Sequence, residues 1–305
     1  MLERKILDWL SLALIPEIGP ARGKRLLERF KEPGKILSAS TGEIASLLGD
    51  SLAQTIDQRR KNIDLETQVR LIEKYEVKIL TLDDSAYPKN LKNIFDPPLV
   101  LFMRGRILIE DNLSIAIVGT RIATIYGMNM AGKISAQLGQ AGFTIVSGGA
   151  RGIDTASHQA ALRINARTIS VLGCGVDVAY PEENSRLFER IIKNGALISE
   201  FPMSTLPLRQ NFPQRNRIIS GLSLGTVVIE APTRSGALIT ASFALEQGRE
   251  VFCVPGQADS FTMKGSHQLL KEGAKLVEDV DDILEELEPF LKNRGRINEG
   301  FVSNC

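Results

Sequence analysis

Cysteine and histidine are scarce in this chain of 305 residues, and each scarcity excludes a class of site. Three widely spaced cysteines without a CxxC pair predict neither a disulfide framework nor a zinc site. Two histidines, His158 and His267, are too few for a His-based metal cluster, and they weaken any Ser-His or Cys-His catalytic arrangement. We therefore expect no bound metal and no catalytic residue.

Long apolar runs and an excess of one charge are also missing. The first ten residues show no secretory pattern, so we expect a cytoplasmic protein without a membrane anchor. Thirty-seven basic against 36 acidic residues leave a net charge of +1, so nucleic-acid binding would depend on local clustering of cations. The acid-rich run 278–288 is either a solvated helix face or a partner surface.

The chain is long enough for two domains. Residues 1–65 show short helical periods, 66–111 form a connector with short strands, and 291–305 form a tail. Between them, in 112–290, short Val- and Ile-rich segments alternate with helical stretches. This alternation predicts an α/β fold: an extended Rossmann-like, mostly parallel sheet with helices on both faces, preceded by a small all-α domain of helix-hairpin-helix or SAM-like type. The strand candidates of the Rossmann-like part are 114–119, 143–148, 168–173, 196–200, 225–231 and 250–256.

Glycine-rich turns follow the first two of these strands. Gly119, Thr120 and Arg121 end the first. The second runs into a loop before a helix that Asp154 can cap, and the candidate residues of this loop are Ser147, Gly148, Gly149, Arg151 and Gly152. Ligands of such sheets bind beyond the carboxyl ends of the strands, next to helix N-termini, so both turns predict an anion site. An ordinary tight turn is the alternative for each.

The run 211–220 (NFPQRNRIIS) combines an aromatic residue with two arginines at the start of a predicted helix. A guanidinium is always charged and binds two phosphate oxygens at once, so this run indicates a polyanion ligand. Its candidate residues are Phe212, Arg215, Asn216 and Arg217. Arg234 and Ser235, in the turn after the fifth strand, are secondary candidates; close packing against the sheet or a second copy is the alternative there.

The segment 16–30 (PEIGPARGKRLLERF) resembles a helix-hairpin-helix element. The hairpin glycines Gly19 and Gly23 would offer backbone N–H groups to a DNA phosphate, and Lys24 and Arg25 follow directly. A plain helical turn, serving protein contact, is the alternative.

Two nucleotide-binding patterns fail on inspection. Residues 127–133 (GMNMAGK) have the spacing of a phosphate-binding loop, but Ile134 stands where Ser or Thr must bind magnesium, and the match falls in the middle of a predicted helix. Residues 173–178 (GCGVDV) lack the last glycine of a dinucleotide fingerprint. We expect no ATP, NAD or other cofactor.

Several segments together resemble the DNA-processing protein A (DprA/Smf) family from about 113 to 280: VGTR, SGGARGIDTASHQAAL, ISVLGCGVDVAYPEEN, LISEFP, NFPQRNRIISGLS, VVIEAPTRSGALITASFALEQGREVFCVPG and KGSHQLLKEGAKLV. The resemblance implies sequence-tolerant binding of single-stranded DNA, a homodimer, and loading of the RecA recombinase during natural transformation. It places the pocket at Gly119 to Arg121, Ser147 to Gly152 and Phe212 to Arg217. Many members continue into a winged-helix-like domain, whereas this chain ends at Cys305, so the role of that domain stays open.

Two rival functions remain on the sequence alone. Phosphoribohydrolases of nucleoside monophosphates share the Rossmann-like sheet, but they carry a PGGxGTxxE pattern where this chain has APTRSGALIT (231–240). The glycine pair and the acid are absent, so we expect a binding protein rather than an enzyme. A scaffold for a recombinase, with incidental DNA contact, is the second rival.

Overall fold

The structure is a computed structural model that describes residues 2–292. The predicted tail, 291–305, therefore lies outside the described residues, apart from its first two residues, which belong to the last helix. Cys305 lies outside them as well.

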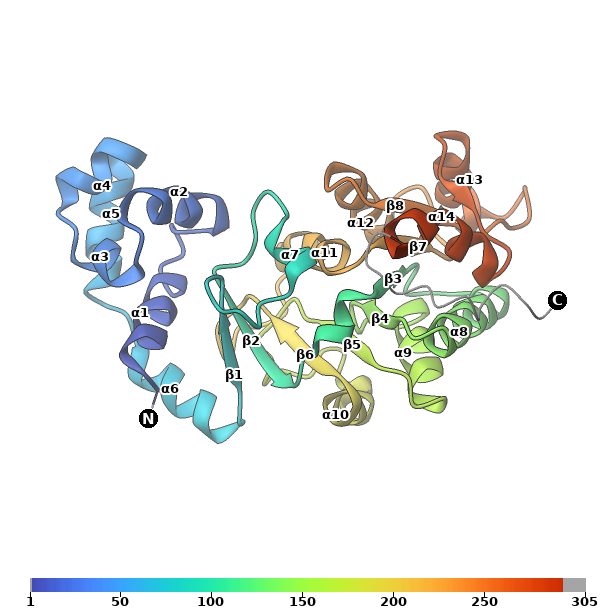
Figure 1. The fold of residues 1–305 in the computed structure, drawn as a ribbon, viewed down its shortest axis with the longest axis horizontal. Helices are drawn as coiled ribbons and strands as arrows, with labels where there is room; N and C mark the ends of the chain where they lie inside the picture. Colours follow the sequence, from blue (N-terminus) through green and yellow to red (C-terminus); the bar gives the residue numbers. More distant parts are fainter. Residues whose placement is uncertain (1, 293–305) are drawn as a thin grey trace.

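Helices make up the first quarter of the chain, as predicted, and form a lobe at one end of the molecule (Figure 1). Their apolar faces enclose a core that contains Trp9, Leu26 and Ile56 and continues onto Phe102 of the sheet. The lobe is thus packed against the sheet rather than tethered to it. The helices are α1 (Arg4–Ala13), α2 (Pro20–Phe30), α3 (Pro33–Ser38), α4 (Thr41–Leu48), α5 (Asp50–Arg60) and α6 (Leu65–Lys74).

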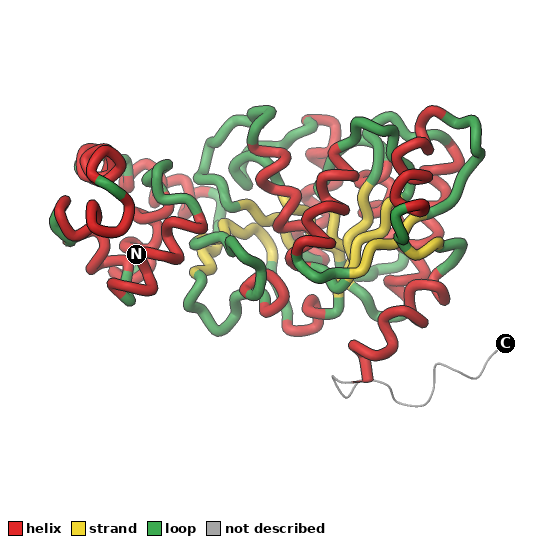
Figure 2. Tube along the Cα trace, turned by 90° about the horizontal axis from the view of Figure 1, so that it is seen from above, coloured by secondary structure: helices red, strands yellow, loops and turns green. Residues whose placement is uncertain are grey.

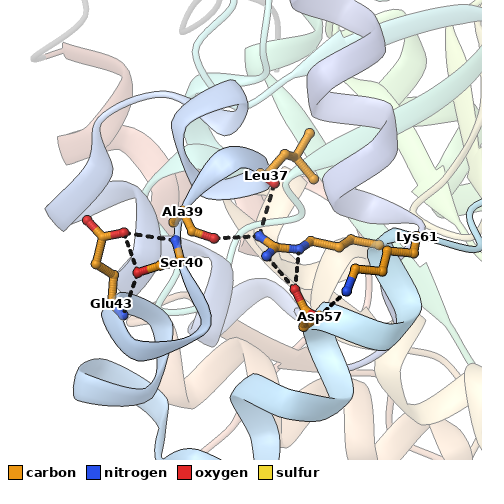
Figure 3. A network of polar contacts seen from close by, with 7 residues as sticks. Leu37, Ala39, Ser40, Glu43, Asp57 and Lys61 are labelled. Atoms are coloured by element: carbon orange, nitrogen blue, oxygen red, sulfur yellow. Dashed lines mark hydrogen bonds and ion pairs between the residues drawn. The ribbon is translucent and has the colours of Figure 1, made fainter.

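Side-chain caps and an arginine link the helices of this lobe (Figure 3). Ser40 and Glu43 form a capping box at the start of α4, with the Ser40 amide 2.8 Å from a Glu43 carboxylate oxygen. Arg60 at the end of α5 donates to Asp57 and to the carbonyls of Leu37 and Ala39, at 3.0 and 2.7 Å. The end of α3 is therefore held by α5, because Arg60 satisfies carbonyls that a helix terminus leaves without partners.

A sheet of nine strands runs through the rest of the molecule in the order β1-β2-β6-β5-β4-β3-β7-β8-β9. The strands from β6 to β9 pair in parallel, and β1 and β2 extend the edge antiparallel. All six predicted strands of the Rossmann-like part and both strands of the predicted connector are present; β9 was not predicted. The strands are β1 (Lys78–Thr81), β2 (Val100–Gly105), β3 (Ser114–Val118), β4 (Thr144–Ser147), β5 (Thr168–Val171), β6 (Ala196–Ser199), β7 (Gly225–Val228), β8 (Glu250–Cys253) and β9 (Lys275–Leu276).

Helices cover both faces of the sheet, as predicted (Figures 1 and 2). The core of one face joins the strands to α7 (Lys89–Lys92), α11 (Asn211–Leu222), α12 (Gly236–Glu246) and α13 (Lys264–Lys271). The cores of the other face join them to α8 (Ile125–Gln140), α9 (Ile153–Arg163), α10 (Ser185–Asn194) and α14 (Val280–Lys292). Both faces of the central strands are buried, which explains their continuous Val and Ile runs.

The direction of strand order reverses at β3, which lies between β4 and β7. The loops after β3 and β7 therefore leave the sheet toward opposite faces and open a crevice at the carboxyl ends, where ligands of open α/β sheets bind.

Residues 127–133 lie inside α8, which confirms that they form no phosphate-binding loop. Gly127 is required there because a Cβ would come within 2.1 Å of a carboxylate oxygen of Glu230.

Candidate nucleic-acid interface

A cavity of about 290 Å³ opens at the carboxyl ends of β3 and β7. It is lined by the loop after β3, by α11 and by the first turn of α12 with the loop before it. A smaller recess of about 40 Å³ adjoins it and shares Arg121, Phe212 and Arg215 with it. The predicted convergence of separate loops at this edge of the sheet is therefore present in the structure.

Arg121 and Arg215 meet at the ring of Phe212. Their guanidinium carbons lie 5.1 and 5.9 Å from the ring centroid. Arg121 is exposed, so its charge is available to a ligand, and the negative face of the aromatic ring attracts both cations. Tyr180, which the sequence did not single out as a site residue, lies beside the same ring with its centroid at 5.6 Å.

Arg215 is buried, with 4% of its surface exposed, although it lines the cavity. Its Nη1 donates to the carbonyls of Gly148, at 2.6 Å, and Val171, which lie at the ends of β4 and β5. Burial lowers the pKa of the guanidinium to about 10, so Arg215 is charged at neutral pH. Arg215 thus links α11 to the ends of β4 and β5 and places a positive charge beneath the cavity.

The second glycine loop uses part of its backbone internally. The amides of Gly148 and Ala150 donate to the buried carboxylate of Asp154, at 3.1 and 3.2 Å, so these two amides already have a partner within the loop. Burial raises the pKa of Asp154, and Arg215 opposes this shift. The hydroxyl of Ser147 is buried and donates to the Ile117 carbonyl at 2.7 Å.

Backbone conformation and close contacts explain why glycine occupies two positions of this loop. Gly149 and Gly152 have φ angles of 68° and 72°, a region that side chains disfavour. A Cβ at Gly152 would also lie 2.4 Å from the Thr120 carbonyl, so the first and second loops approach each other only because this residue is glycine. His158, on the helix that follows, is fully buried, and its Nδ1 lies 2.7 Å from the Thr168 hydroxyl.

Two predicted arginines are paired with carboxylates. Arg151 is exposed at the rim of the small recess and pairs with Glu183, which raises the pKa of Arg151 and lowers that of Glu183. Arg217 is buried, pairs with Glu200 and Asp96, and lines neither the cavity nor the recess. The expectation that Arg217 joins the pocket is thus corrected: it neutralises Glu200, whose pKa is raised by burial.

The remaining candidates of the Rossmann-like part frame the cavity. Asn216 donates to the Gly236 carbonyl at 3.1 Å, which ties α11 to the start of α12. Ser235 caps α12 by accepting from the Ala237 amide. Arg234 is exposed at the cavity wall, so it is the second cation, after Arg121, that reaches the solvent side of the cavity.

The predicted hairpin in the helical lobe differs from the expectation. Gly19 caps α2, but Gly23 lies within its first turns, and its amide donates to the Gly19 carbonyl at 2.8 Å. A Cβ at Gly23 would lie 2.4 Å from the Leu99 side chain, so this glycine allows α2 to approach the sheet. Lys24 and Arg25 are exposed on α2 and stay candidates for a secondary contact.

Within residues 2–292, no cluster of three or more His, Cys, Asp or Glu side chains is arranged to hold a metal ion. No helix in the same range has the length and apolar character needed to cross a membrane. Cys174 and Cys253 are free and buried, and burial raises the pKa of both thiols.

Fold and cavity together define a Rossmann-like protein with a cation-lined crevice at its switch point. The chain belongs to the DNA recombination-mediator protein A family, whose model matches residues 78–288. This confirms the predicted family.

Relatives extend the similarity over most of the chain. Protein Smf of Synechocystis is 39% identical over 289 residues, which are 92% of this chain and 72% of that protein. The crystal structure of DNA processing protein A from Streptococcus pneumoniae has a TM-score of 0.81 at 34% identity and covers 93% of this chain and 99% of its own. The Helicobacter pylori protein, solved to describe its single-stranded DNA binding mode, has a TM-score of 0.62 at 29% identity, over 70% of this chain and 97% of its own.

Proposed function

We propose that this protein binds single-stranded DNA with little sequence preference in the crevice at the carboxyl ends of β3 and β7. The observation that carries the proposal is the meeting of Arg121, from the loop after β3, with Arg215 and the Phe212 ring of α11, far away in the chain. An exposed cation beside an aromatic ring suits a nucleotide strand, because the cation neutralises a phosphate while the ring stacks on a base. The Helicobacter relative supports the choice of ligand.

The exposure of each arginine decides how it contributes to DNA binding. Arg121 and Arg234 are exposed at the cavity and contact phosphate oxygens directly, whereas Arg215 acts from below the floor. Arg151 joins them only when it leaves Glu183. The backbone amides that remain at the glycine turns add to the site, as helix N-termini do in other anion sites.

We further propose that the protein loads the RecA recombinase onto this strand during natural transformation and recombination, and that it does so as a homodimer in the cytoplasm. The family of recombination mediators supports the first part. A dimer has two crevices, and linking two modest sites raises the affinity for one strand through effective concentration.

A salt-dependent anisotropy titration with labelled oligo-dT tests the DNA proposal. With about three or four phosphates neutralised, log K should fall against log salt with a slope of about −2 to −3. Replacing both exposed arginines, Arg121→Ala with Arg234→Ala, should weaken binding strongly and flatten this slope. Arg190→Ala, at an exposed position of α10 away from the cavity, is the matched control. Equal affinity of the double variant and the wild type would place the DNA elsewhere.

The recombinase proposal has its own assay. RecA-driven strand exchange on DNA covered with a single-strand-binding protein should start sooner when this protein is present, and the double arginine variant should not shorten the lag. DNA binding without any change of the lag would leave a DNA-binding protein that is no loader. Light scattering after size exclusion checks the dimer, and incubation with nucleoside monophosphates checks for free base, which we expect to be absent.

A further inference from the structure

The small recess beside the main cavity combines arginines with two aromatic rings. Its lining includes the arginines Arg121, Arg151 and Arg215, the rings of Phe212 and Tyr180, and the glycines Gly148 and Gly173. A Cβ at Gly148 would lie 2.6 Å from the Arg215 guanidinium, and one at Gly173 would lie 2.9 Å from the Phe212 ring. Larger residues at these two positions would therefore displace Arg215 and Phe212, and no carboxylate is among the residues that line the recess.

Tyr180 is the exposed aromatic surface of this recess. It is 41% exposed, and its ring is tilted by 40° to that of Phe212 at a centroid distance of 5.6 Å. Phe212 is half-buried and already in contact with two guanidinium groups, so Tyr180 presents the more accessible ring. Accessible rings beside cations are the surfaces on which the bases of single strands stack.

The exposed ring of Tyr180 decides how a base can bind at the recess. A base that lies across the mouth of the recess contacts this ring through its face. Contact through a ring face reads no hydrogen-bonding edge, so this mode tolerates any sequence.

We propose that Tyr180 is a base-stacking residue: one nucleobase of a bound single strand lies on its ring, while Arg121 holds the adjoining phosphate. The inference rests on the proposed DNA function and adds a second aromatic contact to it. Stacking on Tyr180 and the charge of Arg121 are separate contributions, because one depends on the base and the other on the backbone.

The experiment compares oligo-dT with an abasic oligonucleotide of the same length, in anisotropy titrations of the full chain. Tyr180→Leu should weaken oligo-dT binding about 10-fold, Tyr180→Phe should bind like the wild type, and neither should alter binding of the abasic strand. Arg121→Ala should weaken both strands by a similar factor. In addition, a strand carrying 5-iodouracil should cross-link to Tyr180 on irradiation, with the modified peptide identified by mass spectrometry.

Each result decides one of the two proposals. If the wild type does not bind oligo-dT, the proposed function fails. If it binds, and Arg121→Ala weakens it but Tyr180→Leu does not, only the stacking role fails. Equal weakening of both strands by Tyr180→Leu would show a structural effect and also overturn it. Thermal unfolding of Tyr180→Leu, with a midpoint like that of the wild type, ensures that the comparison concerns folded protein.

Discussion

Helix α11 carries an arginine on each of two sides, and the two arginines have different roles. On one side, Arg215 lies at the cavity with the Phe212 ring and the carbonyls of Gly148 and Val171. On the other, Arg217 lies between Glu200 and Asp96. Residues two apart on an α-helix are turned by about 200°, so two arginines of one short motif cannot face the same ligand.

This difference separates ligand binding from stability. The Glu200 side chain is mostly buried, with 12% of its surface exposed, and Arg217 compensates its charge. Arg121, by contrast, is exposed and compensates no buried charge. A cation near a site is therefore a binding residue only if its partners leave it available.

The largest effect is expected from Arg217→Met. Removing the partner of a buried carboxylate should lower the free energy of unfolding by about 3–5 kcal/mol, measured by urea denaturation. Adding Glu200→Leu to this variant should restore much of the loss, since the orphaned charge disappears. A loss below about 1 kcal/mol for Arg217→Met would show that the two sides of α11 do not differ as described.

The pH dependence of stability should carry the signature of His158, which lies near Arg215. Burial, followed by the charge of Arg215, lowers its pKa from 6.5 to about 3 in the folded protein. Between these values the unfolded chain takes up a proton that the folded protein excludes, so stability falls as the pH falls, by about 1.4 kcal/mol per pH unit. The difference between wild type and His158→Gln in urea unfolding at pH 6 and pH 4 measures this slope, and a constant difference would contradict it.

Arg215→Met and Arg121→Met should separate the two cavity arginines. Arg215→Met removes the donor to two buried carbonyls and a positive charge near Asp154, and we expect a loss of about 1–3 kcal/mol in unfolding free energy together with weaker DNA binding. Arg121→Met should change stability by no more than about 0.5 kcal/mol while weakening oligo-dT binding about 10-fold. Equal stability losses in both variants would remove the distinction between floor and ligand-facing arginines.

The smallest effect is expected from Glu183→Gln, which releases Arg151 from its ion pair. An uncompensated Arg151 should tighten oligo-dT binding about 2- to 3-fold at low salt, and the gain should vanish at high salt because both side chains are exposed. Glu182→Gln, at the neighbouring exposed position, is the control and should leave the affinity nearly unchanged. A gain that is the same for both variants would reflect net charge alone.

Much of the fold could be predicted because its signals are local. The six strands between 114 and 253 appear as short Val- and Ile-rich runs, and the helices between them follow from periodicity and from the requirement of parallel strands for crossovers. The two-residue strand β9 was missed because so short a segment has no pattern of its own. The position of the switch point could be predicted only in part. The sequence placed the loops at the carboxyl edge of the sheet but did not give the order of the strands.

The site was predictable to the level of loops, not of side chains. Gly119 to Arg121 and Phe212 were found because glycine turns and an aromatic-arginine run are visible in sequence. Tyr180 and Glu183 were not singled out, although they lie in the segment YPEEN that contributed to the family resemblance. Their meaning depends on Phe212 and Arg151, which are about 30 residues away in the chain.

The sequence by itself determined the alternation of strands and helices, the glycine turns and the family, since each depends on residues close together in the chain. Only the tertiary structure decided that Arg121 is exposed to solvent and that Arg215 is hydrogen-bonded beneath the cavity. It also decided that Arg217 forms ion pairs with Glu200 and Asp96. The physical reason is that the role of a charge is set by its partners and its burial, and both come from segments that meet only when the chain folds.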